Sequence, residues 1–218
     1  MSRRIAVVTV AILALIGFAA AGAFYSRSSG DAQAPAAAPA TNLLVRAHSP
    51  VLGPQNAPVT IVEFFDPSCE ACRAMYPIVK QIMAQYPNDV RLVLRYAPFH
   101  QGSEEAIRIL ETARAQGVFV PVLEAILAAQ PEWHDDARAA RAWTAAAAAG
   151  LDVQKAREAM RSPQMTANLN QDVADLQALG VRGTPTFFVN GRPLPSASIL
   201  HARTALASTC SRLAHLRG

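Results

Sequence analysis

The sequence predicts an α/β domain into which a block of helices is inserted. An apolar, β-branched run at residues 59–65 leads directly into an amphipathic helix, whose apolar positions recur at helical spacing over residues 72–86. A second strand is expected at residues 90–97, parallel to the first through a right-handed crossover. Residues 102–180 then show helical patterns throughout, and a third strand is expected at residues 186–189. Strands separated in this way by helices indicate a mixed fold.

Residues 1–25 are predicted to direct the chain across a membrane. Two arginines form a positive N-terminal region, and the 21 residues at 5–25 carry no charge. That run is long enough to span the ~30 Å hydrocarbon core, which favours an uncleaved signal anchor in the inner membrane. The Ala-Gly-Ala sequence at residues 21–23 also fits a signal-peptide cleavage site, so release after cleavage stays open. The positive charge before the span places the rest of the chain outside, which in a bacterium is the periplasmic face.

Residues 26–41 are predicted to be a flexible linker, and residues 42–218 the folded domain. Ala, Pro, Ser, Gly and Gln dominate the linker, which cannot bury enough apolar surface to fold. The domain is long enough for one sizeable core and is expected to open near Leu43 with a short edge strand. Three of the 20 basic and one of the 16 acidic residues precede it, so its own charge balance is only +2. We therefore predict no nucleic-acid partner.

Five helices are expected within the inserted block at residues 102–180. Their boundaries follow from capping residues and glycines, and their apolar faces from helical spacing. The expected helices run from Ser103 to Gly117, over residues 119–127, from Asp135–Asp136 to Gly150, as a short helix after Asp152, and from Met165 to Gly180. After the third strand, Asn190-Gly191 fits a hairpin turn, with a short partner strand at residues 192–194 and a final helix from residues 196–198.

Cys69 and Cys72 are separated by two residues at the junction of the first strand and the helix after it. Cys69 falls at the helix N-terminus, where unpaired backbone N–H groups and the helix dipole stabilise a thiolate, the nucleophile of disulfide exchange. Cys72 lies one turn into the helix, close enough to form a disulfide with Cys69. The alternative is a structural zinc site, but Cys210 and the five histidines form no second ligand pair. Asp66 and Arg73 flank this redox dithiol and are expected to shape its electrostatic field.

The segment around the dithiol, FFDPSCEACRAMYP at residues 64–77, resembles the thioredoxin-like superfamily and most closely its periplasmic DsbA branch. A second motif, GVRGTPTFFVNG at residues 180–191, supports the resemblance, which extends from Pro58 to the C-terminus. It implies a thioredoxin-like fold with an inserted helical subdomain. It also implies that Pro185 is a cis-proline facing the dithiol, and that the backbone of Thr184 pairs with the substrate.

The resemblance implies a protein thiol–disulfide oxidoreductase that forms, reduces or shuffles disulfides in exported proteins. Cys69 would form a mixed disulfide with the substrate, and Cys72 would resolve it. No cofactor is implied, because the disulfide itself carries two electrons, and a membrane redox partner would reset the dithiol. A monomer is expected, since the chain has no room for the N-terminal dimerisation domain of isomerase-type relatives. The alternative is a thioredoxin-like envelope binding module, such as a thiol-based copper carrier.

Glu63 lies six residues before Cys69, and strand alternation places it on the same face as Ile61 and Phe65. The resemblance implies a buried carboxylate here, with a raised pKa, that exchanges a proton with Cys72. The alternative is a water-exposed acid at the edge of the sheet. We therefore predict Glu63 as the third catalytic residue.

Three further polar residues carry predictions of their own. His100 follows the second strand and is expected to pack or cap rather than to catalyse. Cys210 shares the apolar face of the last helix, which predicts an inert buried thiol, although a disulfide with a partner stays open. Glu70 lies between the two cysteines, where strongly oxidising DsbA proteins carry a Pro-His pair. Its negative charge is expected to give Cys69 a higher pKa than a histidine would, and to make the disulfide a weaker oxidant.

Overall fold

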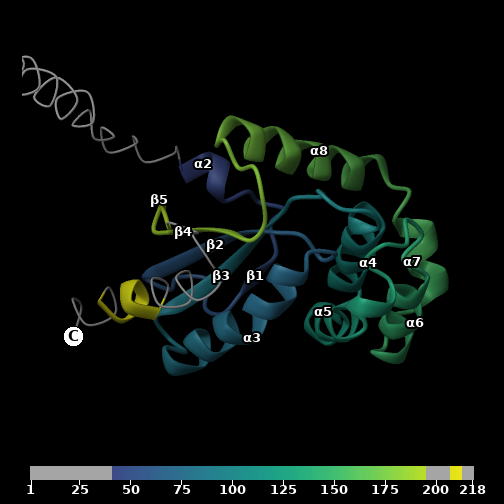
Figure 1. Ribbon diagram of the computed structural model, residues 1–218, viewed down its shortest axis with the longest axis horizontal. Coiled ribbons are helices and arrows are strands. Elements are labelled where there is room, and N and C mark those ends of the chain that lie inside the picture. The colour runs from purple at the N-terminus through teal and green to yellow at the C-terminus, as the bar shows by residue number, and fades with distance from the viewer. Residues whose placement is uncertain (1–40, 195–206, 213–218) are drawn as a thin grey trace, which may run out of the picture. The chain divides into compact units, whose positions relative to one another are not determined.

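The computed structural model describes residues 41–194 and 207–212, with a five-stranded sheet in the order β1-β3-β2-β4-β5 (Figure 1). The strands are β1 (Val51–Leu52), β2 (Val59–Phe65), β3 (Val90–Tyr96), β4 (Thr186–Val189) and β5 (Arg192–Pro193). β2 and β3 pair in parallel along their full lengths, and the other three pairs are antiparallel. The predicted α/β class and the parallel central pair are confirmed.

Alternating side chains give the central strands two buried faces, and helices cover both of them (Figure 1). The face that carries Ile61 and Phe65 packs against α3 (Glu70–Gln85) and the inserted helices. The opposite face, with Val62 and Phe64, packs against α8 (Pro163–Ala178). Because the side-chain period of a strand is two, β2 contributes to both cores at once. The dithiol that follows β2 is therefore held between two packed layers.

The inserted block is helical throughout, as predicted. It consists of α4 (Ser103–Ala115), α5 (Phe119–Ala128), the 3-10 turn η1 (Gln130–Glu132), α6 (Ala140–Ala148), α7 (Val153–Ala159) and α8. Asp152 caps α7, because its carboxylate accepts a hydrogen bond from the N–H of Lys155 at 3.1 Å. The third helix begins later than predicted. Asp136 accepts hydrogen bonds from the N–H groups of Arg138 and Ala140, both at 3.0 Å, and so stabilises a turn ahead of α6.

The prediction of an edge strand near Leu43 was wrong. Residues Thr41–Leu44 form the short helix α2, and the edge strand is β1, which begins at Val51. Leu44 is almost fully buried in the core beneath α8, and the backbone carbonyl of Leu43 accepts a hydrogen bond from the guanidinium of Arg95. A helix end leaves such carbonyls without intrahelical partners, and Arg95 satisfies one of them.

The predicted signal or anchor at residues 1–25 lies outside the described residues, as do nearly all of the linker and the predicted start of the final helix at residues 196–198. Residues 207–212 are helical. Within the described part of the chain, no helix has the length and hydropathy needed to span a membrane.

A buried cluster of ion pairs joins α8 to the sheet. Arg95 in β3 is fully buried, and its guanidinium lies 2.7 Å from Asp172 and 2.6 Å from Asp175, both on α8. Arg46 binds Asp175 at 2.6 Å, and the Nε2 of His48 lies 2.7 Å from Asp172. Because each of the two aspartates on α8 contacts two basic side chains from outside that helix, the cluster holds α8 in one position over the sheet.

Asp172→Ala is expected to lower the free energy of unfolding by at least about 3 kcal/mol, because it leaves the Arg95 guanidinium buried with fewer partners. Urea unfolding followed by circular dichroism would measure the loss. The matched control is Asp152→Ala, which removes an exposed helix cap and should cost about 1 kcal/mol. A loss at Asp172 no larger than the loss at Asp152 would contradict this expectation.

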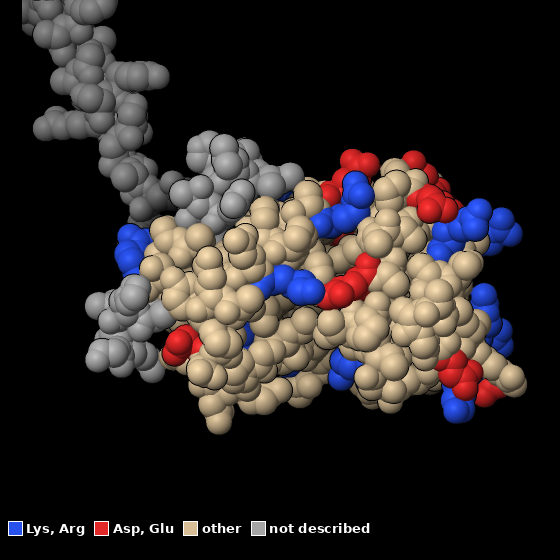
Figure 2. All heavy atoms as spheres, turned by 90° about the horizontal axis from the view of Figure 1, so that it is seen from below, with Lys and Arg blue, Asp and Glu red and all other residues tan. Residues whose placement is uncertain are grey.

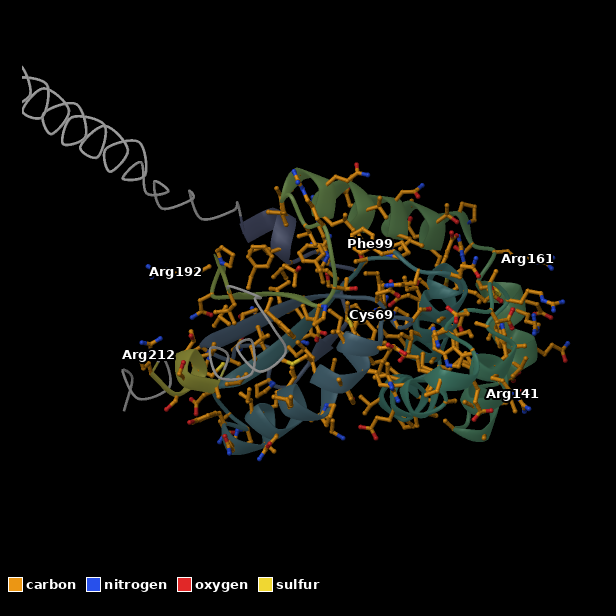
Figure 3. All side chains as sticks on the ribbon, viewed as in Figure 1. Cys69, Phe99, Arg141, Arg161, Arg192 and Arg212 are labelled. Carbon is orange, nitrogen blue, oxygen red and sulfur yellow. The ribbon has the colours of Figure 1, made fainter. Side chains whose placement is uncertain are left out.

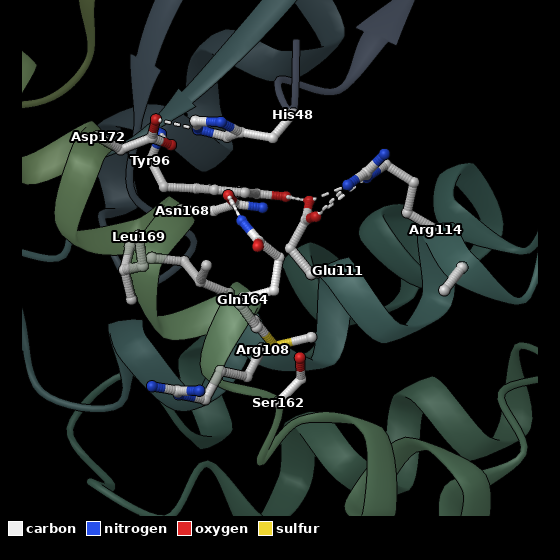
Figure 4. Close-up of a pocket in the computed structure, with 13 residues that line it drawn as sticks. His48, Tyr96, Arg108, Glu111, Arg114, Ser162, Gln164, Asn168, Leu169 and Asp172 are labelled. Carbon is white, nitrogen blue, oxygen red and sulfur yellow. Dashed lines mark hydrogen bonds and ion pairs between the residues drawn. The ribbon is translucent and has the colours of Figure 1, made fainter. Parts of the chain in front are cut away.

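A cavity of about 190 Å³ lies beside the ion-pair cluster, between α4 and α8 (Figure 4). Its charged side chains bind one another, with Arg114 2.5 Å from Glu111 and His48 beside Asp172. The hydroxyl of Tyr96 donates a hydrogen bond to Glu111 at 2.8 Å. The polar groups that line this cavity are therefore largely satisfied from within the protein.

Candidate active site

The two cysteines lie where β2 ends and α3 begins. Cys69 is the N-cap residue of α3, with extended backbone dihedrals, and its N–H donates to the carbonyl of Asp66 at 3.1 Å. Cys72 lies in the first turn of the helix and is fully buried, whereas Cys69 keeps 7% of its surface exposed. Both thiols are free, so the structure represents the reduced dithiol. Figure 3 labels Cys69 at the start of α3. Cys69 is therefore the sulfur that an incoming group can reach.

The two thiols have opposite pKa shifts. The hydrogen bond from the Cys72 thiol lowers the pKa of Cys69 to about 5 against the effect of burial, and the N–H groups of Ala71 and Cys72 lower it further. Burial raises the pKa of Cys72 well above its ordinary value, and the hydrogen bond with Cys69 and the charge of Glu63 raise it further. At neutral pH the pair therefore consists of a Cys69 thiolate and a Cys72 thiol.

Iodoacetamide is expected to alkylate Cys69 at pH 7 at least about tenfold faster than Cys72 or Cys210. Burial raises the pKa of Cys210 to about 11. The scarcity of its thiolate outweighs the greater nucleophilicity that a more basic thiolate has. Mass mapping after timed quenching would give the three rates, and the rate at Cys69 should fall as the pH drops through about 5. In urea all three should react alike, and fast labelling of native Cys210 would contradict the expectation.

Glu63 lies on the β2 face that carries Ile61 and Phe65, and only 1% of its surface is exposed. Neither carboxyl oxygen has a hydrogen-bond partner within the described residues. Burial, and then the charge of Cys69, raises the pKa of Glu63 to about 8. The burial and the raised pKa agree with the expectation from the sequence. The exchange of a proton with Cys72 stays a prediction.

The Thr184–Pro185 peptide bond is cis, and it lies against the dithiol. The Sγ of Cys69 lies 3.3 Å from the carbonyl oxygen of Thr184, to which it can donate only while it is protonated. The loop reaches this position because β4, which follows it, pairs antiparallel with β2. The pairing of Thr184 with a substrate backbone stays a prediction.

Asp66 is a fully buried carboxylate that ties the cysteine loop to the turn after β3. Its oxygens accept hydrogen bonds from the N–H of Ser68 at 2.9 Å and from the hydroxyl of Ser103 at 2.6 Å. The Nδ1 of His100 lies 2.7 Å from Asp66. This contact raises the pKa of His100, and the charges of Asp66 and Cys69 raise it further. His100 thus braces the turn, as expected, and also places a basic group near the dithiol.

Gln130 is a site residue that the sequence did not indicate. It is fully buried in η1, and its Nε2 donates to the carbonyls of Pro67 at 2.7 Å and Cys69 at 3.0 Å. The helical insertion thereby holds the backbone of the cysteine loop. No motif surrounds Gln130 in the sequence, so only the folded chain brings it to the dithiol.

Unsatisfied polar atoms are concentrated around the dithiol. Within the described residues, the buried side-chain nitrogen and oxygen atoms without a hydrogen-bond partner belong to Glu63, Ser68, Arg73, Gln130 and Thr184. These residues come from the segments that meet at the two cysteines. Because folded proteins normally pair their buried polar groups, this concentration marks where water or a bound molecule supplies the missing partners.

The sequence profile of the family described as Thioredoxin matches residues 46–204. Among solved structures, a thioredoxin-like oxidoreductase from Silicibacter pomeroyi DSS-3 is 31% identical, with a TM-score of 0.67 over 79% of this chain and 98% of that one. BdbD from Bacillus subtilis is 22% identical, with a TM-score of 0.67 and coverage of 78% and 94%. The thiol-disulfide exchange protein alpha-DsbA2 from Wolbachia pipientis is 19% identical, with a TM-score of 0.68 and coverage of 79% and 91%. The thioredoxin-like fold is confirmed.

The curated relatives that match are sodium/proton antiporters. The NhaA 3 antiporter of Salinispora tropica is 34% identical over 170 residues, and the NhaA antiporter of Herminiimonas arsenicoxydans is 31% identical over 162 residues. The matches cover 77% and 74% of this chain but 25% of each antiporter, so the chain spans about a quarter of the length of these relatives. The name antiporter describes those whole proteins, and we do not assign antiport to this chain.

Proposed function

The chain belongs to the thioredoxin family, with DsbA-like structural neighbours, and from this premise we propose that it is a thiol–disulfide oxidoreductase of exported proteins. The observation that carries the proposal is the pair of opposed thiols: a Cys69 thiolate at a helix N-terminus and a buried Cys72 thiol one turn later. The cis bond before Pro185 lies beside them. A reactive sulfur next to a protected one is what a two-step exchange requires.

In the oxidising direction, a substrate thiolate attacks Sγ of Cys69 in the Cys69–Cys72 disulfide. A substrate–Cys69 bond forms, the Cys69–Cys72 bond breaks, and Cys72 leaves as a thiolate that takes up a proton. A second substrate thiolate then attacks the substrate sulfur of the mixed disulfide and releases the Cys69 thiolate. The substrate has lost two electrons, which the dithiol now holds. In the reducing direction the steps are reversed, and Cys72 attacks the mixed disulfide.

Glu63 supplies the proton that Cys72 takes up. Its carboxyl group has no partner among the described residues, and with a pKa of about 8 it is mainly protonated at neutral pH. The transfer moves the negative charge from Cys72, whose pKa is raised well above its ordinary value, to Glu63, which is the more acidic of the two buried groups. In the reducing direction the carboxylate accepts the proton back and so generates the attacking Cys72 thiolate.

The substrate segment pairs with the backbone at Thr184 and Pro185, in the manner of strand addition. The segment at residues 1–25 places the domain on the periplasmic face, anchored or released. That compartment is oxidising and allows net disulfide formation. A membrane redox partner resets the dithiol after each turnover, and the domain acts as a monomer.

Two features of Cys72 favour exchange over the alternative of a thiol-based copper carrier. Cys72 is fully buried, and its pKa is raised well above the ordinary value. A metal–thiolate site needs both sulfurs deprotonated. A dithiol in which one thiol has a low pKa and the other a high pKa is better suited to two successive thiol–disulfide exchanges.

The test combines insulin reduction with oxidative refolding of a reduced multi-disulfide protein in a glutathione buffer. Wild type is expected to accelerate at least one of the two reactions, Cys69→Ser neither, and Cys210→Ser as much as wild type. The equilibrium potential against glutathione, measured on the same samples, would give the favoured direction of electron flow. Tight Cu(I) binding with neither reaction accelerated would support the carrier instead.

A further inference from the structure

Arg73 is a cation beside the dithiol whose side chain is left unpaired. It lies one turn after Cys69, and its N–H donates to the Cys69 carbonyl at 3.1 Å. Its Nε is buried without a hydrogen-bond partner, and no ion pair joins it to another described residue. Glu70, one turn earlier on α3, does not pair with it. A guanidinium has five N–H donors in a fixed fork that matches a carboxylate. The donors of a partly buried arginine therefore usually have hydrogen-bond partners.

A groove of about 300 Å³ begins at Arg73 and runs between α3 and α5. We call it the α3–α5 groove, and we define it by Arg73, Tyr76, Lys80, Glu124 and Leu127. Figure 2 looks onto the face of the molecule that contains α3 and α5, which is mostly uncharged, with basic and acidic side chains meeting near its centre. The groove thus combines apolar walls with a few charged groups.

The charges in the α3–α5 groove balance at one end and not at the other. Lys80 lies 2.5 Å from Glu124, and the hydroxyl of Tyr76 donates to the same carboxylate at 3.4 Å. These contacts neutralise the end far from the dithiol. Among the described residues that line the groove, Arg73 is the charged side chain without an ion-pair partner, and it lies at the end that adjoins Cys69.

We propose that the α3–α5 groove docks the substrate segment that flanks the reacting cysteine, and that Arg73 selects segments carrying an acidic side chain. The inference rests on the proposed function, because the occupant is a polypeptide whose sulfur is joined to Cys69. In the proposed function, the part of the segment on one side of its cysteine pairs with the backbone at Thr184. The part on the other side can lie along the start of α3, where Arg73 follows Cys69 by one turn. Charge complementarity then favours a carboxylate at Arg73, where it fills the vacant donors of the guanidinium.

Chain geometry indicates where the acidic residue lies. Side chains one turn apart on a helix are separated by about 5–6 Å at their Cβ atoms. In an extended segment, residues two apart lie about 7 Å from each other and point to the same side. A carboxylate two residues from the substrate cysteine is therefore placed to reach Arg73 while the cysteine reaches Cys69.

The test compares short unstructured peptides with a single cysteine and either Asp or Asn two residues before or after it. Stopped-flow measurement gives the rate constant for attack of each peptide on the oxidised protein, and oxidised glutathione serves as the reference for the intrinsic reactivity of each peptide. After this correction, we expect wild type to favour the better Asp peptide about fivefold at low salt, and less as salt screens the pair. Arg73→Lys should keep most of the preference, Arg73→Gln should abolish it, and Arg73→Glu should reverse it.

Arg138→Gln is the matched control, because it removes an equal charge from an exposed position in the helical insertion, away from the α3–α5 groove. It should keep the wild-type preference. The ratio of two peptides on one variant cancels any change in the pKa or folding of that variant. Equal Asp/Asn ratios for wild type and Arg73→Gln would overturn the inference while leaving the oxidoreductase intact. Failure of every peptide to react with wild type would instead overturn the proposed function.

Discussion

Cys72→Ser is expected to stop the reaction at the mixed disulfide between Cys69 and a substrate. The variant replaces the Cys72 thiol, whose hydrogen bond does most to favour the Cys69 thiolate, with a hydroxyl that can also donate, and the first-turn N–H groups of α3 remain. Cys69 therefore still attacks substrate disulfides. The buried thiol that would displace the substrate is gone, and the adduct should last for minutes to hours, the timescale of uncatalysed disulfide rearrangement. Turnover in insulin reduction should be lost.

Non-reducing gels of envelope extracts from cells that express the variant would reveal the trapped adducts. They should disappear on reduction and be absent from a Cys69→Ser, Cys72→Ser double variant. Cys210→Ser serves as the matched control, because it removes a buried thiol remote from the site and should behave as wild type. Adducts that persist in the double variant would show that Cys210 itself forms mixed disulfides, and the adducts of Cys72→Ser could then not be assigned to Cys69.

Glu63→Gln is expected to raise the free energy of unfolding by about 5 kcal/mol above pH 8. The pKa of Glu63 is about 8 in the folded protein, against 4.5 for a glutamate carboxyl group in water. Between these two values the folded state retains a proton that the unfolded state has released, so the stability of wild type falls as the pH rises through this window. The gap is worth about 5 kcal/mol, and the neutral glutamine avoids the penalty.

Urea unfolding of the reduced proteins at pH 4, 6 and 8.5 would measure this difference. The stability gain should be smallest at pH 4, where both states of wild type hold the proton, and largest at pH 8.5. A second readout addresses catalysis: the variant should exchange more slowly, and its pH–rate profile should lose the break near pH 8. A gain in stability that does not vary with pH would show that packing, and not ionisation, is responsible.

His100 changes the electrostatic picture that the sequence suggested. The dipeptide Glu70-Ala71 offers no cation to the Cys69 thiolate, and this led to the expectation of a weaker oxidant. In the folded protein, Asp66 holds His100 in a turn near the dithiol and raises its pKa. This contact favours the protonated imidazole, so another segment offers the dithiol a cation, paired with Asp66, that the dipeptide lacks. The expectation for the redox potential stays a prediction, to be tested by Glu70→His.

The sequence by itself determined the features that depend on neighbours in the chain. The run of β2 into α3, the placement of Cys69 at the N-terminus of α3 and the inward face of Glu63 follow from periodicity, because helices and strands are built from local spacing. The low pKa of Cys69 follows largely from the same local geometry. The motif around Pro185 added the cis-proline through a resemblance.

Only the tertiary structure decided which distant groups complete the site. Gln130 reaches the carbonyl of Cys69 across 61 positions, and Asp66 reaches His100 across 34. Arg95 is satisfied by Asp172, whereas Arg73 is left unpaired. The two arginines look alike in the sequence, and local spacing does not tell them apart. Their partners depend on which side chains packing brings within about 3 Å, because a hydrogen bond is made or lost over such a distance.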